Sequence, residues 1–274
     1  MKKSVVIFLW ALLAIPAWCQ SDSTALAKLD TLLTRYYLGM ERLPVEEKFV
    51  ECDYLIGSCG DSLVRQHVAL NIYDHYLDSR VMGEEAVAIH VYDSWFANGK
   101  VSMGSDIRLM NAGIFADFNR NTLIGMDAPE ITLYSPDGEA VELPSSGRTS
   151  VLFFYDTNCS KCKSATILLP HVMENVDFDV DLYMVYSGTD SEAWAAYRKN
   201  FSILNDKVHI IHLWDPEIES DYQRLYGLIS TPKIYVTEPQ GTIIGRRLEM
   251  DSLMQVLPFA GAIQEMYENH VKEK

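Results

Sequence analysis

The chain has 274 residues, of which 23 are Lys or Arg and 38 are Asp or Glu, so its formal charge at pH 7 is −15. An acidic chain without a basic cluster is repelled by phosphate backbones and anionic lipids, which argues against nucleic acid or an anionic membrane as a partner. The length exceeds what one hydrophobic core usually serves, so we expect two domains.

The first 19 residues have the pattern of a cleavable secretory signal peptide. Lys2 and Lys3 precede an unbroken apolar run at 5–15, and small residues follow near a cleavage site. The run is shorter than the roughly 20 residues that a membrane-spanning helix needs, which makes a retained anchor the weaker alternative. We therefore expect an exported protein of the periplasm or cell envelope, with no membrane span in its mature form.

A lipoprotein is a second, less favoured alternative for this terminus. Cys19 could carry a lipid after cleavage, but Trp18 stands where a lipidation signal has Gly or Ala. In either case the compartment is oxidising and permits disulfides.

Residues 20–120 are expected to form an all-helical domain. Apolar residues recur there at three- and four-residue steps, at Leu26, Leu29, Leu33 and Tyr36 and again at Leu63, Leu70, Tyr73 and Leu77. Asp61 or Ser62 is a candidate N-cap for the second of these helices. Gly83 and the turn at 98–100 are stop signals, so the pattern predicts four or five helices.

After a linker at 121–128 the period of the pattern changes, and residues 129–274 are expected to form an α/β domain. A hairpin is predicted at 130–144, because two short alternating runs flank the turn sequence Pro136-Asp137-Gly138. Strand and helix then alternate to the end of the chain, which predicts a central mixed sheet flanked by helices.

The expected elements of this sheet begin with a mostly apolar strand at 149–155, a helix from Cys159 to about residue 175 and a strand at 180–187. The later elements are a helix at 191–201, a strand at 208–214, a helix around 219–226, strands at 233–237 and 242–248 and a last helix from Asp251.

Two cysteines three residues apart, Cys159 and Cys162, are the candidate reactive groups. Cys159 falls where a strand passes into a helix, so unpaired backbone N–H groups and the helix dipole favour its thiolate, and Lys161 and Lys163 add positive charge. Cys162 lies on the same helical face, with its Cβ roughly 5–6 Å away. The spacing fits a reversible pair in which Cys159 attacks and Cys162 resolves a mixed disulfide.

Two other readings of the pair are weaker. A permanent disulfide across three residues would restrain little of the unfolded chain. A zinc site would need two more soft ligands, and His209 and His212 on one strand point to opposite faces. We therefore expect no metal and no cofactor other than the redox-active Cys159–Cys162 disulfide.

Residues 128–270 resemble the thioredoxin-like domain of TlpA-like envelope proteins, on the strand at 149–155 that leads into Cys-Ser-Lys-Cys and on the sequence at 226–236. There, Thr231-Pro232 is similar to the family's cis-proline loop. The resemblance implies a cis peptide bond, a substrate strand held by Thr231 and Pro232, and two kinds of partner: cysteine-containing envelope proteins and an electron donor.

The sequence also departs from this family. Asn158 replaces a common tryptophan, and Phe153 occupies the position where thioredoxin keeps a buried aspartate for proton transfer. Asp156 is nearby and could substitute as the acid. The helix proline, Pro170, lies eight residues past Cys162 instead of five. The direction of electron flow therefore stays open.

The helical half more loosely resembles a domain of unassigned function that precedes thioredoxin-like domains in some envelope proteins. Cys52 and Cys59 within it are a candidate structural disulfide, with two buried thiols or a redox relay to Cys159 as alternatives.

Two further functions are weighed against exchange. The fold could serve as a scaffold for a binding protein with idle cysteines, because fold does not fix function. A thiol peroxidase is less favoured, because Thr157 precedes Cys159 by two residues where a peroxidatic cysteine follows its threonine by three.

Overall fold

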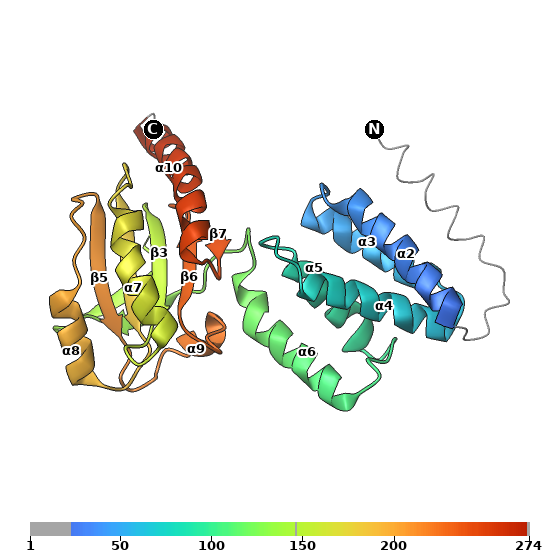
Figure 1. The fold of residues 1–274 in the computed structure, drawn as a ribbon. Helices are drawn as coiled ribbons and strands as arrows, with labels where there is room; N and C mark the ends of the chain where they lie inside the picture. Colours follow the sequence, from blue (N-terminus) through green and yellow to red (C-terminus); the bar gives the residue numbers. More distant parts are fainter. Residues whose placement is uncertain (1–22, 146, 273–274) are drawn as a thin grey trace. The chain divides into compact units, whose positions relative to one another are not determined.

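The computed structural model describes residues 23–145 and 147–272, so the expected signal peptide at 1–19 lies outside the described residues. Contacts divide the chain into two compact units, one with the described residues up to 80 and residues 84–110, the other with residues 81–83 and those after 110. The first is helical and the second contains a sheet (Figure 1), in the order that the sequence predicts. The domain boundaries drawn from the sequence stay predictions.

The helical region follows the expected elements closely. Its helices are α2 (Ser23–Met40), α3 (Val45–Ser58), α4 (Ser62–Leu77), α5 (Glu85–Val91), the π-helical turn η1 (Tyr92–Phe96), α6 (Asp106–Asn119) and the 3-10 turn η2 (Arg120–Thr122). Asp61 caps α4, because its carboxylate accepts hydrogen bonds from the backbone N–H groups of Leu63 (2.8 Å) and Val64 (3.0 Å). The predicted N-cap is therefore confirmed at Asp61.

A buried ion pair lies inside the helical unit. Lys48 of α3 is 3% exposed and its ammonium binds the carboxylate of Glu84, which also accepts a hydrogen bond from the Ser79 hydroxyl. Such a pair is tolerated inside a core because each charge finds both an opposite charge and a hydrogen-bond partner.

The second unit holds a seven-stranded mixed sheet in the order β2-β1-β5-β4-β3-β6-β7. Its strands are β1 (Ile131–Tyr134), β2 (Ala140–Leu143), β3 (Thr149–Tyr155), β4 (Val180–Tyr186), β5 (Val208–Trp214), β6 (Lys233–Thr237) and β7 (Ile243–Arg246). β3, β4 and β5 run parallel, and β6 and β7 extend the sheet antiparallel to β3. The predicted α/β architecture with a mixed central sheet is confirmed.

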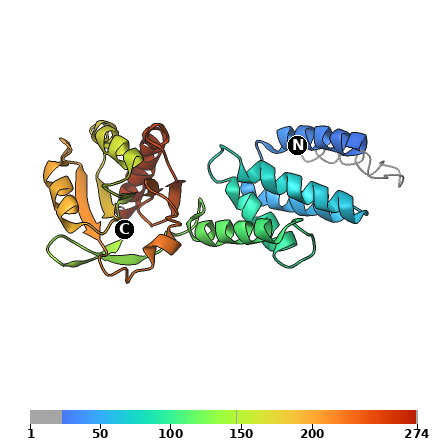
Figure 2. The same cartoon turned by 60° about the horizontal axis from the view of Figure 1, so that its bottom comes forward.

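Both faces of the sheet are covered (Figure 2), which explains why every residue of β3 and β4 is buried. One core joins the sheet to three helices, α7 (Ser160–Met173), α8 (Ser191–Asn200) and α10 (Met250–Lys272). The other core lies against α9 (Tyr222–Leu225), a single turn that is shorter than the helix predicted there. Consecutive residues of β3, such as Phe153 and Phe154, point into different cores.

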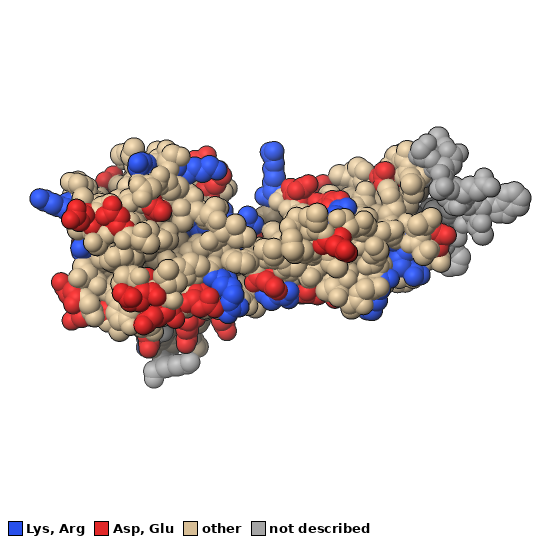
Figure 3. All heavy atoms as spheres, turned by 90° about the horizontal axis from the view of Figure 1, so that it is seen from below, with Lys and Arg blue, Asp and Glu red and all other residues tan. Residues whose placement is uncertain are grey.

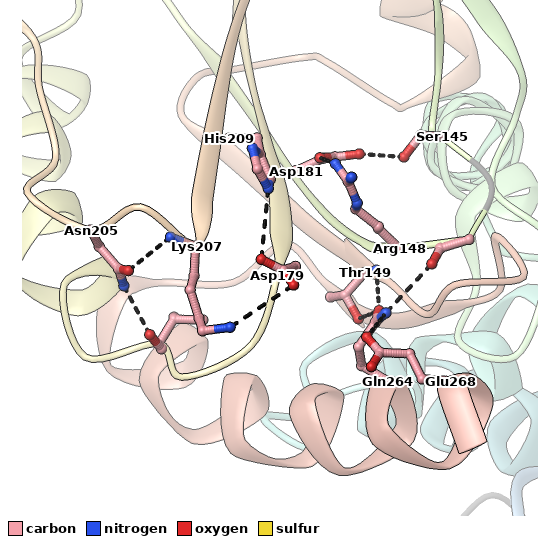
Figure 4. Close-up of polar contacts among 12 residues, drawn as sticks. Ser145, Arg148, Thr149, Asp179, Asp181, Asn205, Lys207, His209, Gln264 and Glu268 are labelled. Atoms are coloured by element: carbon pink, nitrogen blue, oxygen red, sulfur yellow. Dashed lines mark hydrogen bonds and ion pairs between the residues drawn. The ribbon is translucent and has the colours of Figure 1, made fainter. Parts of the chain in front are cut away.

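Polar side chains tie down the end of the sheet where β3 begins (Figure 4). Gln264 of α10 is 2% exposed and accepts a hydrogen bond from the Thr149 backbone N–H at 2.7 Å. Asp181 of β4 is bound by the Ser145 hydroxyl (2.6 Å) and by the Arg148 guanidinium (3.2 Å). These contacts fix the start of β3, seven residues of buried strand away from the cysteine pair.

The face drawn in Figure 3 carries groups of Asp and Glu side chains with Lys and Arg between them, which agrees with the formal charge of −15. Among the described helices, none has the length and apolarity to cross a membrane.

Candidate active site

A tight turn at the end of β3 places Cys159 at the start of α7. The Asp156 carboxylate accepts a hydrogen bond from the Asn158 N–H (2.7 Å), and the Asp156 carbonyl accepts one from the Cys159 N–H (3.2 Å). Cys159 is the N-cap residue of α7, and its sulfur accepts a hydrogen bond from the Cys162 N–H at 3.1 Å. The sulfur therefore faces backbone donors that stabilise a thiolate.

The two sulfurs differ in acidity. Burial acts to raise the pKa of Cys159, but hydrogen bonds with the Cys162 side chain and N–H, the Thr231 side chain and the Lys161 N–H outweigh burial and lower the pKa below its ordinary value. Cys162 is 1% exposed, and burial raises its pKa to about 11. Lys161 lowers the pKa of Cys159 through a hydrogen bond from its backbone N–H. From the sequence, we expected the positive charge of its side chain to have this effect.

The loop before β6 brings Thr231 and Pro232 to the cysteine pair. The Thr231–Pro232 peptide bond is cis, as the resemblance implied. The Thr231 carbonyl oxygen lies 3.3 Å from the Cys159 sulfur, although the two residues are 72 positions apart in the chain. The structure therefore brings together all four residues singled out around the redox pair.

Two pockets flank the pair. One of about 580 Å³ lies between α7 and α8 and is lined by Cys162, Tyr155, Tyr197 and Phe201 among others. The other, of about 530 Å³, lies beside Thr231 and Pro232 and is closed by the start of α7 and by the segment at 247–251. Cys162 therefore borders one pocket and the cis-proline loop borders the other.

No carboxylate replaces the buried aspartate of thioredoxin at Phe153. Phe153 is fully buried and stacks on Tyr155 at a centroid distance of 5.5 Å. Asp156 lines the pocket that also contains Cys162, but one of its carboxylate oxygens is occupied by the Asn158 N–H. The position that holds the proton-transfer aspartate in thioredoxin therefore offers no acid-base group to Cys162.

The candidate structural disulfide between Cys52 and Cys59 is not formed, because both cysteines are free. They lie seven residues apart along α3 and its C-cap, an axial separation of about 10 Å, whereas a disulfide needs Cα atoms within about 7 Å. The helix ends only at Ser58, too late for the chain to turn back before Cys59. Burial raises the pKa of Cys52 to about 12, which fits the alternative of a buried thiol.

The described residues contain no cluster of three or more His, Cys, Asp or Glu side chains with the arrangement of a metal site. His212 is held among Tyr197 and Phe201, and burial lowers its pKa to about 4. His209 lies 3.8 Å from the carboxylate of Asp179. The two histidines of β5 thus have separate surroundings.

Two features near the site escaped the sequence reasoning. The Thr231 side chain lowers the pKa of both sulfurs, a role beyond the substrate binding that the resemblance implied for Thr231. Lys233 is a buried lysine at the start of β6. The one available signal was a charged residue that opens an otherwise apolar strand directly after the proline.

Comparison with known proteins shows the fold. No family model and no curated protein matches the sequence. Among solved structures, a thioredoxin-like protein from Bacteroides caccae has 15% sequence identity and a TM-score of 0.59, and the match covers 85% of this chain and 84% of that one.

Two further solved structures match about half of this chain. The thioredoxin domain of a thiol-disulfide oxidoreductase from Bacteroides vulgatus has 23% identity and a TM-score of 0.44 over 50% of this chain and 97% of that one. A thiol:disulfide interchange protein from a Bacteroides species has 19% identity and a TM-score of 0.40 over 52% of this chain and 92% of that one. The match to the B. caccae structure shows that the chain has a thioredoxin-like fold. The helical region that precedes this fold is seen in the structure of the chain itself.

Proposed function

We propose that the protein is an exported thiol-disulfide oxidoreductase that exchanges disulfides with cysteine-containing proteins of the cell envelope. The observation that carries the proposal is the position of the Cys159 sulfur, which accepts the Cys162 N–H at the start of α7 and lies 3.3 Å from the carbonyl of the cis-proline loop. A sulfur with a lowered pKa beside a buried partner thiol is suited to attack and resolution.

The exchange runs in two displacements. The Cys159 thiolate attacks one sulfur of a substrate disulfide, a mixed disulfide forms, and the other substrate sulfur leaves as a thiolate. Cys162 then loses its proton and attacks the Cys159 sulfur, which releases the substrate dithiol and leaves a Cys159–Cys162 disulfide. Two electrons pass to the substrate, and an electron-donor partner restores the dithiol; the reverse sequence oxidises a substrate.

Substrate binding is assigned to the cis-proline loop. Thr231 and Pro232 line the pocket of about 530 Å³, and an extended substrate segment placed against Thr231 would bring its cysteine to Cys159. Resolution requires that Cys162 loses a proton, because its pKa of about 11 keeps it a thiol at neutral pH and Phe153 offers no acid-base group.

Trapping tests the proposal. Cys162→Ser should accumulate mixed disulfides through Cys159 in envelope extracts, seen as slow bands on non-reducing gels that vanish on reduction. The double variant Cys159→Ser/Cys162→Ser is the matched control and should give none. If the single and double variants give identical patterns, the exchange activity is wrong.

A redox-inactive binding protein is the second candidate, favoured by the fully buried Phe153 at the proton-transfer position. A glutathione titration with differential alkylation separates the two. A reversible midpoint between about −270 and −120 mV supports exchange, whereas a pair that stays oxidised below about −300 mV supports the scaffold.

A further inference from the structure

Lys233 carries a charge at a buried position, which is energetically unfavourable. It opens β6, pairs with Phe154 of the central strand β3 and is 8% exposed. Burial, with the nearby charge of Arg247, lowers the pKa of its ammonium to about 8, so a charge is kept there at a cost in desolvation. An apolar β-branched residue would suit the strand better.

The ammonium of Lys233 links the end of the cis-proline loop to its start. It donates a hydrogen bond to the carbonyl of Gly227, six residues earlier, and the same carbonyl accepts the Ile229 N–H at 2.9 Å. Two residues further along β6, the Tyr235 hydroxyl donates to the neighbouring carbonyl of Tyr226 at 2.6 Å. Two side chains of one strand face thus hold the two residues at which the loop begins.

The start of the loop is itself fixed in place. Gly227 has a positive φ of 60°, and a Cβ atom there would lie 2.0 Å from the carbonyl oxygen of Phe118 in the last turn of α6. The middle of the loop has little packing of its own, because Ile229 is 63% exposed and Ser230 is exposed as well. The position of Thr231 therefore depends on the anchored ends of the loop.

We propose that Lys233 is a positioning residue for thiol-disulfide exchange: its bond to the Gly227 carbonyl holds the cis-proline loop so that Thr231 stays against the sulfur of Cys159. The inference rests on the proposed function for its effect on catalysis. Its effect on Cys159 is separate, because the Thr231 side chain is one of the groups that lower the pKa of that thiol.

The test compares Lys233→Met, which keeps the length and removes the donor, with the wild type and with Lys199→Met, a control on an exposed lysine of α8. Two quantities are measured: the pKa of Cys159, from the pH dependence of its alkylation rate, and kcat/KM for reduction of a disulfide-bonded peptide. Lys233→Met should raise the pKa of Cys159 and lower kcat/KM roughly threefold to tenfold, the scale of one ordinary hydrogen bond. Lys199→Met should change neither.

The outcomes distinguish this inference from the proposed function. A folded Lys233→Met protein with wild-type pKa and kcat/KM overturns it, and so does a loss of stability with an unchanged pKa of Cys159. If Lys233→Met does not fold by circular dichroism, Lys233→Ile, which also lacks a donor and suits a strand, is judged by the same two quantities. A wild type without exchange activity refutes the proposed function, while the pKa comparison still decides the role of Lys233.

Discussion

At the scale of single residues, the acidity of Cys159 comes mainly from hydrogen bonds to its sulfur. Hydrogen bonds from the backbone of α7 and with the side chains of Cys162 and Thr231 lower the pKa of Cys159. A mechanism of this kind is sensitive to small displacements, because a hydrogen bond weakens steeply with distance and angle.

Removing the Thr231 hydroxyl should therefore raise the pKa of Cys159. We expect the pKa of Cys159 to be higher in Thr231→Val than in the wild type, since a hydrogen bond that favours the thiolate is lost. The thiolate ultraviolet absorbance measured against pH gives the shift. Thr157→Val is the control, because the Thr157 hydroxyl pairs with Tyr186 at 3.4 Å. Equal pKa values in all three proteins would contradict the role of the hydroxyl.

Cys162 should make the stability of the reduced protein fall at alkaline pH. Burial raises its pKa from 9.0 to about 11 in the folded state, so the folded protein holds this proton more tightly than the unfolded chain. The resulting stability is fully present below pH 9 and is lost as the pH rises towards 11.

Urea unfolding of the reduced wild type and of Cys162→Ala at pH 8 and at pH 10.5 measures this effect. Buried tyrosines also titrate at alkaline pH, but they do so in both proteins, so their contribution cancels in the difference between the two. The difference in unfolding free energy should shrink at the higher pH. A difference that stays constant or grows would show that the pKa of Cys162 is not raised.

At the scale of elements, the buried pair between α3 and the turn before α5 is the contact most sensitive to substitution in the helical unit. Lys48→Met should lower the free energy of unfolding by about 3–5 kcal/mol, because the carboxylate of Glu84 would remain buried without its counter-charge. Urea denaturation followed by circular dichroism gives the value.

The double variant Lys48→Met/Glu84→Gln is the matched control for this pair. It removes both charges, so its loss should be clearly smaller than that of Lys48→Met alone. A double variant that is less stable than the single one would mean that packing of the Lys48 chain, and not its charge, holds the helices.

Elements with a local cause were predictable from the sequence. Asp61 caps α4 through its own two neighbours, and the hairpin of β1 and β2 follows from the turn at 136–138. The buried face of α4 was less well predicted: it is formed by Val68, Ala69, Ile72, Tyr73 and Tyr76. Leu63, expected on the apolar stripe, is 65% exposed because it lies in the first turn, outside this face.

The sequence did not predict which groups bind its buried charges. The partner of Lys48 is a carboxylate 36 residues away, and the partner of Lys233 is a backbone carbonyl six residues earlier. The spacing of apolar residues in the sequence indicates which face of a helix or strand is buried, but it does not indicate which group a buried charge binds. For that reason Cys159, Cys162 and the cis-proline loop could be located, whereas the tether from Lys233 to Gly227 could not.

At the scale of the whole molecule, the chain consists of two compact units with separate cores. We expect calorimetric unfolding of the reduced protein to show more than one transition, because two-state behaviour is typical of single domains. Lys48→Met should move only the transition of the helical unit and leave the pKa of Cys159 unchanged. Coincident movement of all transitions would show that the two units unfold as one.

The unequal exposure of the two sulfurs has a consequence beyond exchange with proteins. A small oxidant that meets the reduced chain reaches the partly exposed Cys159 before the buried Cys162. The sulfenic acid that forms on Cys159 then has a thiol within its own helix turn, and attack by Cys162 expels water and yields the disulfide. Oxidation is thereby diverted from the irreversible sulfinic acid into a disulfide, the form that the proposed exchange would return to the dithiol.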